Sequence, residues 1–353
     1  MTLRVPWLAT RDESPLQAAV LLPLHPLSWL YGAGAWAQRA LHRKGVLRRS
    51  RFPGRVVSVG NLVVGGTGKT PLAAWIATGL HRRGHKVAIV SRGYGRRAGD
   101  SVTVVSDGRF IHSRAELAGD EAMVLASHAP RVPVLVGRDR ALAGWRALSA
   151  FGAEVLVLDD GFQHHRLHRD VDLVTFDGGL GLGNRWLLPR GPLREPANAL
   201  RQAHAIVVVD GPLPAADAAF IGRVASEAQC FEARRVPVGL RPLRGGVGAS
   251  PEVLQGTEVG LLAAVAYPAG FRRTLESLGA RVVAERTFRD HHRYRKRDLR
   301  GLAARAPLWV TTEKDAVKIL PSWTGTADVR VLRIEIEVAE PERLLSWVDV
   351  LLR

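Results

Sequence analysis

The residues best suited to chemistry in this sequence form a glycine-rich loop that ends in Gly-Lys-Thr. The loop follows the apolar run Arg55 to Asn61 and precedes a helix-like segment, Pro71 to Leu80. Glycines let backbone N–H groups approach phosphate oxygens closely, and a helix that starts there adds its dipole. The lysine can bridge the outer phosphates, and the threonine can offer its hydroxyl to Mg²⁺. The pattern predicts a nucleotide site formed by Val63, Val64, Gly65, Gly66, Thr67, Gly68, Lys69 and Thr70.

One position of this loop departs from the strict phosphate-binding pattern. That pattern has a glycine five residues before Gly68, where this sequence has Val63, and its glycines stand instead at 65 and 66. The alternative to a nucleotide site is an ordinary turn whose sequence happens to be Gly-Lys-Thr. Because lysine is scarce in this arginine-rich chain and the correct flanks are present, we favour nucleotide binding.

Acidic residues follow a second predicted strand. Asp159 and Asp160 come directly after the apolar run Val155 to Leu158. This is where a phosphate-loop protein holds Mg²⁺, directly or through water. A simple Asp-Gly turn is the alternative. His164 and His165 follow without a recognisable metal-ligand spacing, so we expect them to orient the acidic pair or to close the turn.

Two further residues could handle the proton of an acceptor hydroxyl. Asp120 precedes an apolar helical run and could act as a base or simply cap that helix. His291, in the segment Phe288 to Tyr294, could couple to a carboxylate across a cleft, although a lone histidine is more often structural. The segment Gly183 to Pro196 is typical of a rigid loop that displays arginines and a carboxylate to phosphate and Mg²⁺, with a surface linker as the alternative.

Apolar strand patterns alternate with helical patterns after the loop. Strands are predicted at residues 86–90, 132–136, 155–158, 171–176 and 205–209. Segments long enough for helices separate most of them, which indicates an α/β fold with a mostly parallel, P-loop-containing sheet flanked by helices. Ligands of such sheets bind beyond the carboxyl ends of the strands, where the loop and the acidic pair lie.

A second α/β pattern follows a stretch rich in proline, glycine and arginine at residues 212–248. Its strands are predicted at residues 259–265, 281–283 and 308–312, and the last leads into a charged helical turn with Lys314 and Asp315. These two residues either touch nucleotide or, as we favour, face solvent. We predict an N-terminal amphipathic segment (1–48), a P-loop core domain (49–225) and a smaller C-terminal α/β domain that completes an interdomain site (226–353).

The composition is globular, with an unusual charge. Of 353 residues, 46% are hydrophobic and 24% charged, which excludes a largely disordered chain. The net charge of +17 comes mainly from arginine and predicts an anionic partner, with an arginine-rich genome as the alternative explanation. No nucleic-acid module is recognisable, so a membrane or an anionic substrate ranks higher. The single cysteine, Cys230, fits a reducing compartment.

Residues 15–41 are strongly apolar and are followed by a basic flank. Prolines and a histidine at residues 23–26 interrupt the run, which is too short to span a bilayer and lacks the features of a secretory signal. Trp29, Tyr31 and Trp36, together with the basic flank, favour a helix that lies in the membrane interface. A helix packed on the protein core is the alternative.

Seven segments together resemble the tetraacyldisaccharide 4'-kinase family. They are VGNLVVGGTGKTP, SRGYGR, GDE, LDDGFQH, LPRGPLREP, DHH and TEKDAVK, beginning at residues 59, 91, 119, 158, 188, 290 and 312. Each motif alone is moderately specific, whereas all seven in the family's order are very specific. The family's phosphate loop also lacks the usual first glycine, so Val63 agrees with the resemblance.

The resemblance implies an ATP- and Mg²⁺-dependent kinase of lipid A biosynthesis. Its substrate would be a tetraacylated glucosamine disaccharide 1-phosphate, phosphorylated on the 4'-hydroxyl at the cytoplasmic face of the inner membrane of a Gram-negative bacterium. The N-terminal segment is similar to the family's membrane-docking helix. The expected partners are therefore this lipid and an anionic membrane surface, without nucleic acid, and we expect a monomer.

The resemblance also assigns roles to individual residues. Asp120 matches the family's catalytic aspartate, and His291 matches its partner histidine. Lys69 is then expected to hold the γ-phosphate. The magnesium-linked positions are Thr70 from the loop and, by resemblance, Asp159, Asp160 and Glu195.

Two other classes of protein share parts of this pattern. A membrane-associated partitioning or scaffolding ATPase also combines a glycine-shifted loop with an amphipathic helix. Those ATPases usually have a signature lysine just before the paired glycines, where this chain has Val64. An ATP-dependent ligase of the biotin-synthesis type has no need of a membrane helix. We therefore favour the kinase hypothesis.

Overall fold

A single mostly parallel β-sheet runs through the protein. The computed structural model describes residues 13–96 and 101–353, and within these ranges twelve strands form one sheet. In chain order they are β1 (Arg55–Asn61), β2 (Val87–Ser91), β3 (Val102–Ser106), β4 (Val134–Gly137), β5 (Val155–Asp159), β6 (Val171–Asp177), β7 (Ala205–Val209), β8 (Gln229–Pro242), β9 (Glu258–Ala263), β10 (Arg281–Thr287), β11 (Leu308–Thr312) and β12 (Asp328–Val338). Across the sheet the order is β10-β9-β11-β12-β8-β7-β6-β1-β5-β2-β4-β3, and only the β3–β4 and β8–β12 pairs are antiparallel.

Helices cover both faces of the sheet. The strands near β1 are runs of valine and leucine buried on both sides, as expected where helices cover each face. The longer helices after β1 are α3 (Lys69–Arg82), α5 (Asp120–His128), α6 (Arg140–Phe151), α7 (Ala215–Val224), α8 (Pro268–Ser277) and α10 (Pro341–Leu351). The short helices and single turns are α4 (Ala115–Ala118), η3 (Ala197–Gln202), η4 (Pro251–Leu254), η5 (Lys296–Leu299), α9 (Glu313–Ala316) and η6 (Pro321–Thr324).

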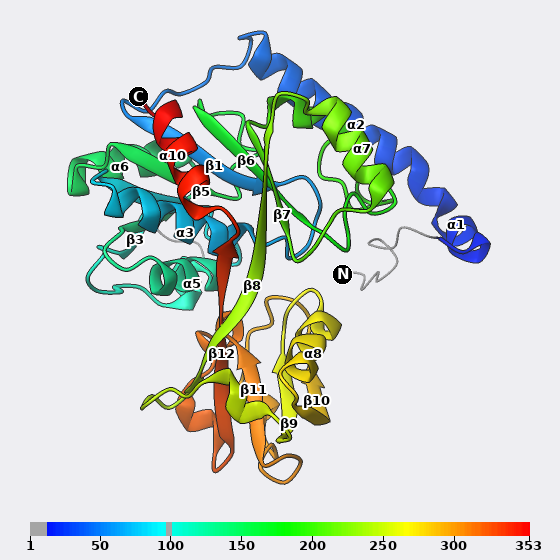
Figure 1. Ribbon diagram of the computed structural model, residues 1–353, viewed down its shortest axis with the longest axis vertical. Coiled ribbons are helices and arrows are strands. Elements are labelled where there is room, and N and C mark those ends of the chain that lie inside the picture. Colours follow the sequence, from blue (N-terminus) through cyan, green and yellow to red (C-terminus); the bar gives the residue numbers. More distant parts are fainter. Residues whose placement is uncertain (1–12, 97–100) are drawn as a thin grey trace.

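Two long strands join a larger and a smaller half of the molecule. Figure 1 shows β8 and β12 running between the halves as an antiparallel pair. The stretch at residues 212–248, which the composition marks as a boundary, in fact contains α7 and the whole of β8. After β12 the chain returns to the larger half, where Leu344 and Val348 of α10 join the core around α3.

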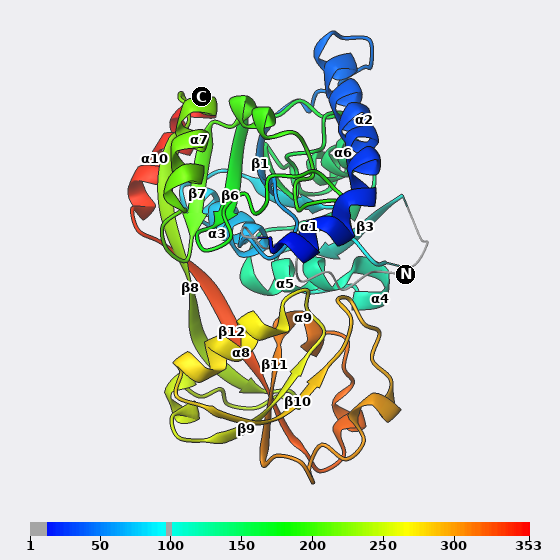
Figure 2. The ribbon, with the colours of Figure 1, turned by 90° about the vertical axis from the view of Figure 1, so that its right-hand side faces the viewer.

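The N-terminal helices lie along one edge of the larger half (Figure 2). They are α1 (Pro15–Leu21), the single turn η2 (Leu22–Leu24) and α2 (His25–Arg43), and Ser14 caps the first of them. The side of α2 that faces the protein is mostly polar, while most of its large apolar side chains are exposed. Those exposed side chains are Leu27, Trp29, Leu30, Trp36 and Leu41. Within the described ranges, no helix combines the length and apolar character needed to cross a membrane.

Candidate active site

The glycine-rich loop connects β1 to α3 and has the backbone geometry that glycine permits. Gly65 and Gly68 have positive φ angles of 128° and 79°, which L side chains rarely adopt. Gly68 is also enclosed, because a Cβ there would lie 3.3 Å from Val209. The α3 helix begins at Lys69, so its free N–H groups and dipole face the loop. The Val63 side chain is buried in the core rather than turned to the loop.

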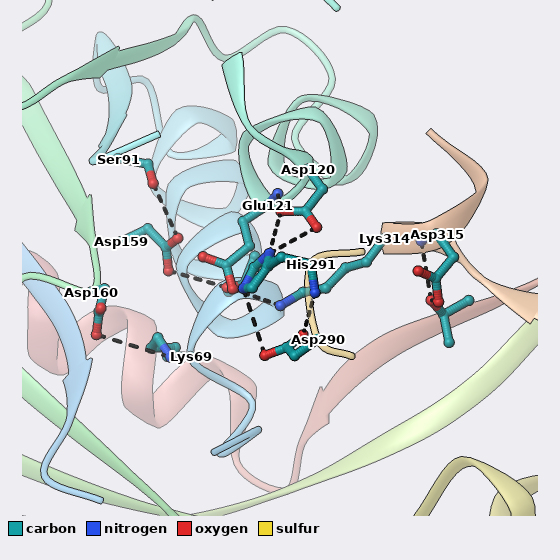
Figure 3. Close-up of polar contacts among 12 residues, drawn as sticks. Lys69, Ser91, Asp120, Glu121, Asp159, Asp160, Asp290, His291, Lys314 and Asp315 are labelled. Atoms are coloured by element: carbon teal, nitrogen blue, oxygen red, sulfur yellow. Dashed lines mark hydrogen bonds and ion pairs between the residues drawn. The ribbon is translucent and has the colours of Figure 1, made fainter. Parts of the chain in front are cut away.

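Lys69 faces the acidic turn that follows β5. Its Nζ lies 3.9 Å from Asp160 Oδ1, and Arg194 donates to both oxygens of Asp160 at 2.7 and 2.9 Å. Burial acts to raise the pKa of the Asp160 carboxyl, but the two cations outweigh it and hold this pKa below its usual value. Figure 3 shows the Lys69 and Asp160 side chains facing each other.

Asp159 presents a buried carboxylate to two hydroxyl groups. Thr70 Oγ1 lies 3.3 Å from one of its oxygens, and Ser91 Oγ lies 3.5 Å from the other. Burial, together with repulsion from Glu121, raises the pKa of Asp159 from 3.8 to about 7. Among the described residues, no cation lies at hydrogen-bonding distance from this buried carboxylate. The carboxylate and the neighbouring threonine hydroxyl are together suitable ligands for Mg²⁺.

The described residues provide no preformed metal cage around these oxygens. In the part of the chain that the structure describes, no group of three or more His, Cys, Asp and Glu side chains is arranged to hold a metal. Mg²⁺ is usually held by one or two carboxylates together with phosphate and water. Thr70 and Asp159 therefore fit the ion, and nucleotide phosphates would complete its ligands.

The aspartate and the histidine predicted to act on a hydroxyl do meet. Asp120 begins α5, His291 follows β10, and His291 Nδ1 lies 3.0 and 3.1 Å from the two carboxylate oxygens. Lys318 Nζ lies 3.3 Å from Asp120 Oδ2. Burial acts to raise the pKa of Asp120, but His291 and the neighbouring lysines hold it at about 2. The hydrogen bond to Asp120 raises the pKa of His291.

A cavity of about 310 Å³ opens beside this pair. Asp120, His291, Tyr94, Arg293 and Lys318 are among its lining residues, so both halves contribute to it. The cavity therefore lies against the Asp120–His291 pair, where the two halves meet.

Ion pairs hold the two halves together beside the cavity. Lys314 of α9 binds Glu121 of α5 at 2.6 Å, and Glu313 binds His128 at the other end of α5 at 2.9 Å. The expectation that Lys314 and Asp315 face solvent is therefore wrong. Asp315 is fully buried, where it accepts a hydrogen bond from the Ala264 N–H.

Glu195 lies in a different environment from the other predicted magnesium-linked residues. It is buried, its Oε1 lies 2.7 Å from His165 Nε2, and its Oε2 lies 3.8 Å from Arg39 of α2. Its neighbours are thus a histidine of the acidic turn and the N-terminal helix. Glu195 is therefore joined to the acidic turn through His165 and to the N-terminal helix through Arg39.

Arg235 of β8 is a residue that the sequence did not single out. Its guanidinium donates to the carbonyl oxygen of Gly66 at 2.9 Å and binds Asp177 and Asp210 at the ends of β6 and β7. It therefore fixes the middle of the glycine-rich loop. The sequence analysis missed it because the segment containing Arg235 was not predicted to be a strand, and the one signal available was that Asp210 directly follows the predicted strand at 205–209.

A parallel sheet with this loop between β1 and α3, followed by carboxylates at the end of β5, defines the class of P-loop nucleotide-binding proteins. The sequence profile of the tetraacyldisaccharide-1-P 4'-kinases matches residues 20–353. The chain belongs to this family.

Individual relatives agree along nearly the whole chain. A tetraacyldisaccharide 4'-kinase of an Anaeromyxobacter species is 42% identical over 341 residues, which cover 94% of this chain and 92% of the relative. The enzyme of the same name from Syntrophus aciditrophicus is 38% identical, with 93% and 91% covered. The crystal structure of LpxK from Aquifex aeolicus in complex with ATP is similar, with a TM-score of 0.76 and 29% identity over 95% of this chain and 100% of that one.

Proposed function

We propose that this protein transfers the γ-phosphate of ATP to the 4'-hydroxyl of a tetraacyldisaccharide 1-phosphate. The observation that carries the proposal is the Asp120–His291 pair, which lines a cavity at the junction of the two halves. The pair also lies close to the glycine-rich loop. Glu121 directly follows Asp120, and the positive charges of Lys69 and Lys314 lower the pKa of Glu121 although burial acts to raise it. Family membership supplies the identity of the acceptor.

In this proposal Asp120 orients the acceptor hydroxyl and accepts its proton. The carboxylate is ionised and held by His291 Nδ1 and the Glu121 N–H, so it cannot rotate freely. His291, whose pKa Asp120 raises, donates its Nδ1–H to this carboxylate and holds it in place, so the proton of the acceptor hydroxyl goes to Asp120. Positioning of this kind is most of what a protein contributes to phosphoryl transfer.

Lys69 and the loop N–H groups would hold the β- and γ-phosphates during the transfer. Thr70 and Asp159 would hold Mg²⁺, which when bound neutralises the charge that develops on the phosphate oxygens. Arg194 keeps Asp160 ionised and directed at Lys69, which fixes the lysine without binding it tightly.

A labelling experiment tests the proposed activity. The purified protein is incubated with γ-³²P-ATP, Mg²⁺ and tetraacyldisaccharide 1-phosphate in mixed detergent micelles. We expect label in the lipid, with Lys69→Met as the inactive control. ATP hydrolysis without labelled lipid would contradict the kinase and favour the ATPase alternative.

We also propose that the exposed apolar side of α2 binds the cytoplasmic face of the inner membrane. Trp29, Leu30 and Trp36 are 64%, 74% and 56% exposed on one helix, and Arg43 and Lys44 follow at its end. Apolar side chains of this kind enter the boundary between headgroups and acyl chains, and the basic end suits anionic lipids. We further propose that the protein acts as a monomer whose functional parts are residues 1–48, 49–225 and 226–353, with α10 of the last part packed on the second.

A vesicle-binding measurement tests this surface. Replacing Trp29, Leu30 and Trp36 together by serine should weaken binding to anionic vesicles at least about 100-fold, since each side chain contributes about 1 kcal/mol or more when buried in lipid. The control replaces Val247 and Leu320, which are exposed on the smaller half, by serine. Equal sedimentation of all three proteins with vesicles would show that α2 is not the membrane surface.

A further inference from the structure

The inner side of α2 contacts the loop that carries Arg194 and Glu195. Ser28 Oγ donates to the Leu187 carbonyl at 2.8 Å, and the Tyr31 hydroxyl donates to the Arg194 carbonyl at 2.9 Å. Gly32 lets the helix come close, because a Cβ there would lie 2.5 Å from Leu187 Cδ1. The helix therefore fits one particular conformation of this loop.

Arg39, about two turns further along α2, extends the contact. It is 8% exposed, its Nη2 donates to Asn198 Oδ1 at 2.9 Å, and its Nη1 lies 3.8 Å from Glu195 Oε2. A buried charge is costly unless an opposite charge lies nearby. Arg39 is the one cation that forms an ion pair with Glu195 among the described arginines and lysines.

The same loop continues into the nucleotide site. Val64 of the glycine-rich loop donates to the Pro192 carbonyl at 2.9 Å, and the Arg194 N–H donates to the Leu62 carbonyl at 2.9 Å. The Arg194 side chain holds Asp160, which faces Lys69. Only Arg194 and Asp160 therefore stand between Tyr31 of α2 and Lys69 of the phosphate site.

Glu195 makes the second connection. It binds His165, and His165 belongs to the turn that begins with Asp159 and Asp160. Several polar atoms in this cluster are buried without a hydrogen-bond partner among the described residues, namely Arg39 Nη1, His42 Nδ1, His165 Nδ1 and Glu195 Oε2. Such a cluster keeps its geometry only while the helix is seated, because few internal hydrogen bonds fix it.

We propose that Tyr31 and Arg39 are positioning residues for phosphoryl transfer, so that α2 is part of the nucleotide site as well as a membrane surface. Tyr31 fixes the backbone from which Arg194 reaches Asp160. Arg39 neutralises Glu195, which in turn holds the turn that carries the Mg²⁺ carboxylate. This inference rests on the proposed kinase function.

The test measures the rate of lipid phosphorylation and the binding of nucleotide without a bilayer, so that the positioning role of α2 is distinguished from its role as a membrane surface. Lipid phosphorylation is measured in detergent micelles at varied Mg²⁺, and binding of Mg²⁺-ATP is measured by titration calorimetry. Tyr31→Phe removes one hydroxyl and should lower kcat about threefold, the effect of one hydrogen bond. Arg39→Gln should lower kcat about tenfold and raise the Mg²⁺ concentration for half-maximal rate several-fold.

Matched variants exclude a general structural effect. Arg39→Lys keeps the charge and should recover most of the rate and the normal Mg²⁺ requirement. Gln38 is exposed beside Arg39, and Tyr267 is exposed on the smaller half. The variants Gln38→Ala and Tyr267→Phe should therefore have the kcat and Mg²⁺ requirement of the parent protein. Vesicle binding of Tyr31→Phe should be unchanged.

Two results would overturn the inference. One is a micellar kcat and Mg²⁺ requirement for Arg39→Gln within twofold of the parent. The other is an equal loss in Arg39→Lys, which would point to packing rather than charge. If the parent protein labels no lipid, the proposed function is contradicted instead. The affinity for Mg²⁺-ATP then tests α2 by itself: weaker binding by Arg39→Gln than by the parent supports its role in the nucleotide site, and equal binding contradicts it.

Discussion

Asp120→Asn is expected to lower kcat for lipid phosphorylation by about 10²–10⁴-fold, the usual range for a residue that accepts a proton in the transition state. Asparagine has nearly the same shape and can still accept hydrogen bonds from the Glu121 N–H and from His291. It lacks the charge that takes the proton. The glycine-rich loop is untouched, so the Kd for Mg²⁺-ATP should stay within about twofold of the parent value.

The stability of this variant should also change with pH in a definite direction. Asp120 raises the pKa of His291 in the folded protein. The stabilisation from their ion pair is therefore fully present below the unfolded histidine pKa of about 6.5 and is lost as pH rises through the higher folded value. Asp120→Asn should accordingly lower Tm more at pH 6 than at pH 9.

Asp290→Asn is the matched control for both measurements. Asp290 lies 3.6 Å from the other nitrogen of His291 and is 42% exposed, so its loss should cost much less activity. Turnover of Asp120→Asn within a few-fold of the parent would show that another group accepts the proton.

The local patterns of the sequence predict the sheet and the strand ends well. The runs at 155–158 and 171–176 become β5 and β6, and the acidic pair lies where a parallel sheet places such residues. Valine-rich strands buried on both faces leave few alternatives to this arrangement. The pairing of Asp120 with His291, 171 residues apart, came from the family resemblance, because spacing alone does not bring such residues together.

Long-range packing explains what the sequence left out. The strand β8 carries charged residues and two prolines, which obscure an apolar pattern, whereas β12 alternates apolar and charged residues and was nevertheless not predicted. Arg235 and Lys318 become important only because these strands and α9 approach the glycine-rich loop and α5. The aromatic residues of α2 predicted a membrane helix. The contacts of Tyr31 and Arg39 could not be predicted, because their partners lie in a loop more than 150 residues away in the sequence.

Asp159→Asn is expected to lower kcat on the order of 100-fold, as removal of one group that stabilises charge in the transition state usually does. The same change should stabilise the metal-free protein. Burial raises the pKa of Asp159 to about 7, so the folded protein binds a proton more tightly than the unfolded chain does. Stability therefore falls as pH rises from about 4 to 7, and at pH 8 the fold contains a buried charge beside Glu121.

The Tm of Asp159→Asn should therefore equal that of the parent near pH 5 and exceed it by roughly 2–5 °C at pH 8 without Mg²⁺. Mg²⁺ with ATP should narrow this difference, because the ion stabilises only the parent carboxylate. Asp160→Asn provides a control of opposite sign. Lys69 and Arg194 lower the pKa of Asp160, so its charge stabilises the fold and its removal should lower Tm at pH 8. If both variants shift Tm in the same direction, the charges of the two carboxylates do not have opposite effects on stability. Asp159 is then not the buried, unpaired carboxylate that we assign to Mg²⁺.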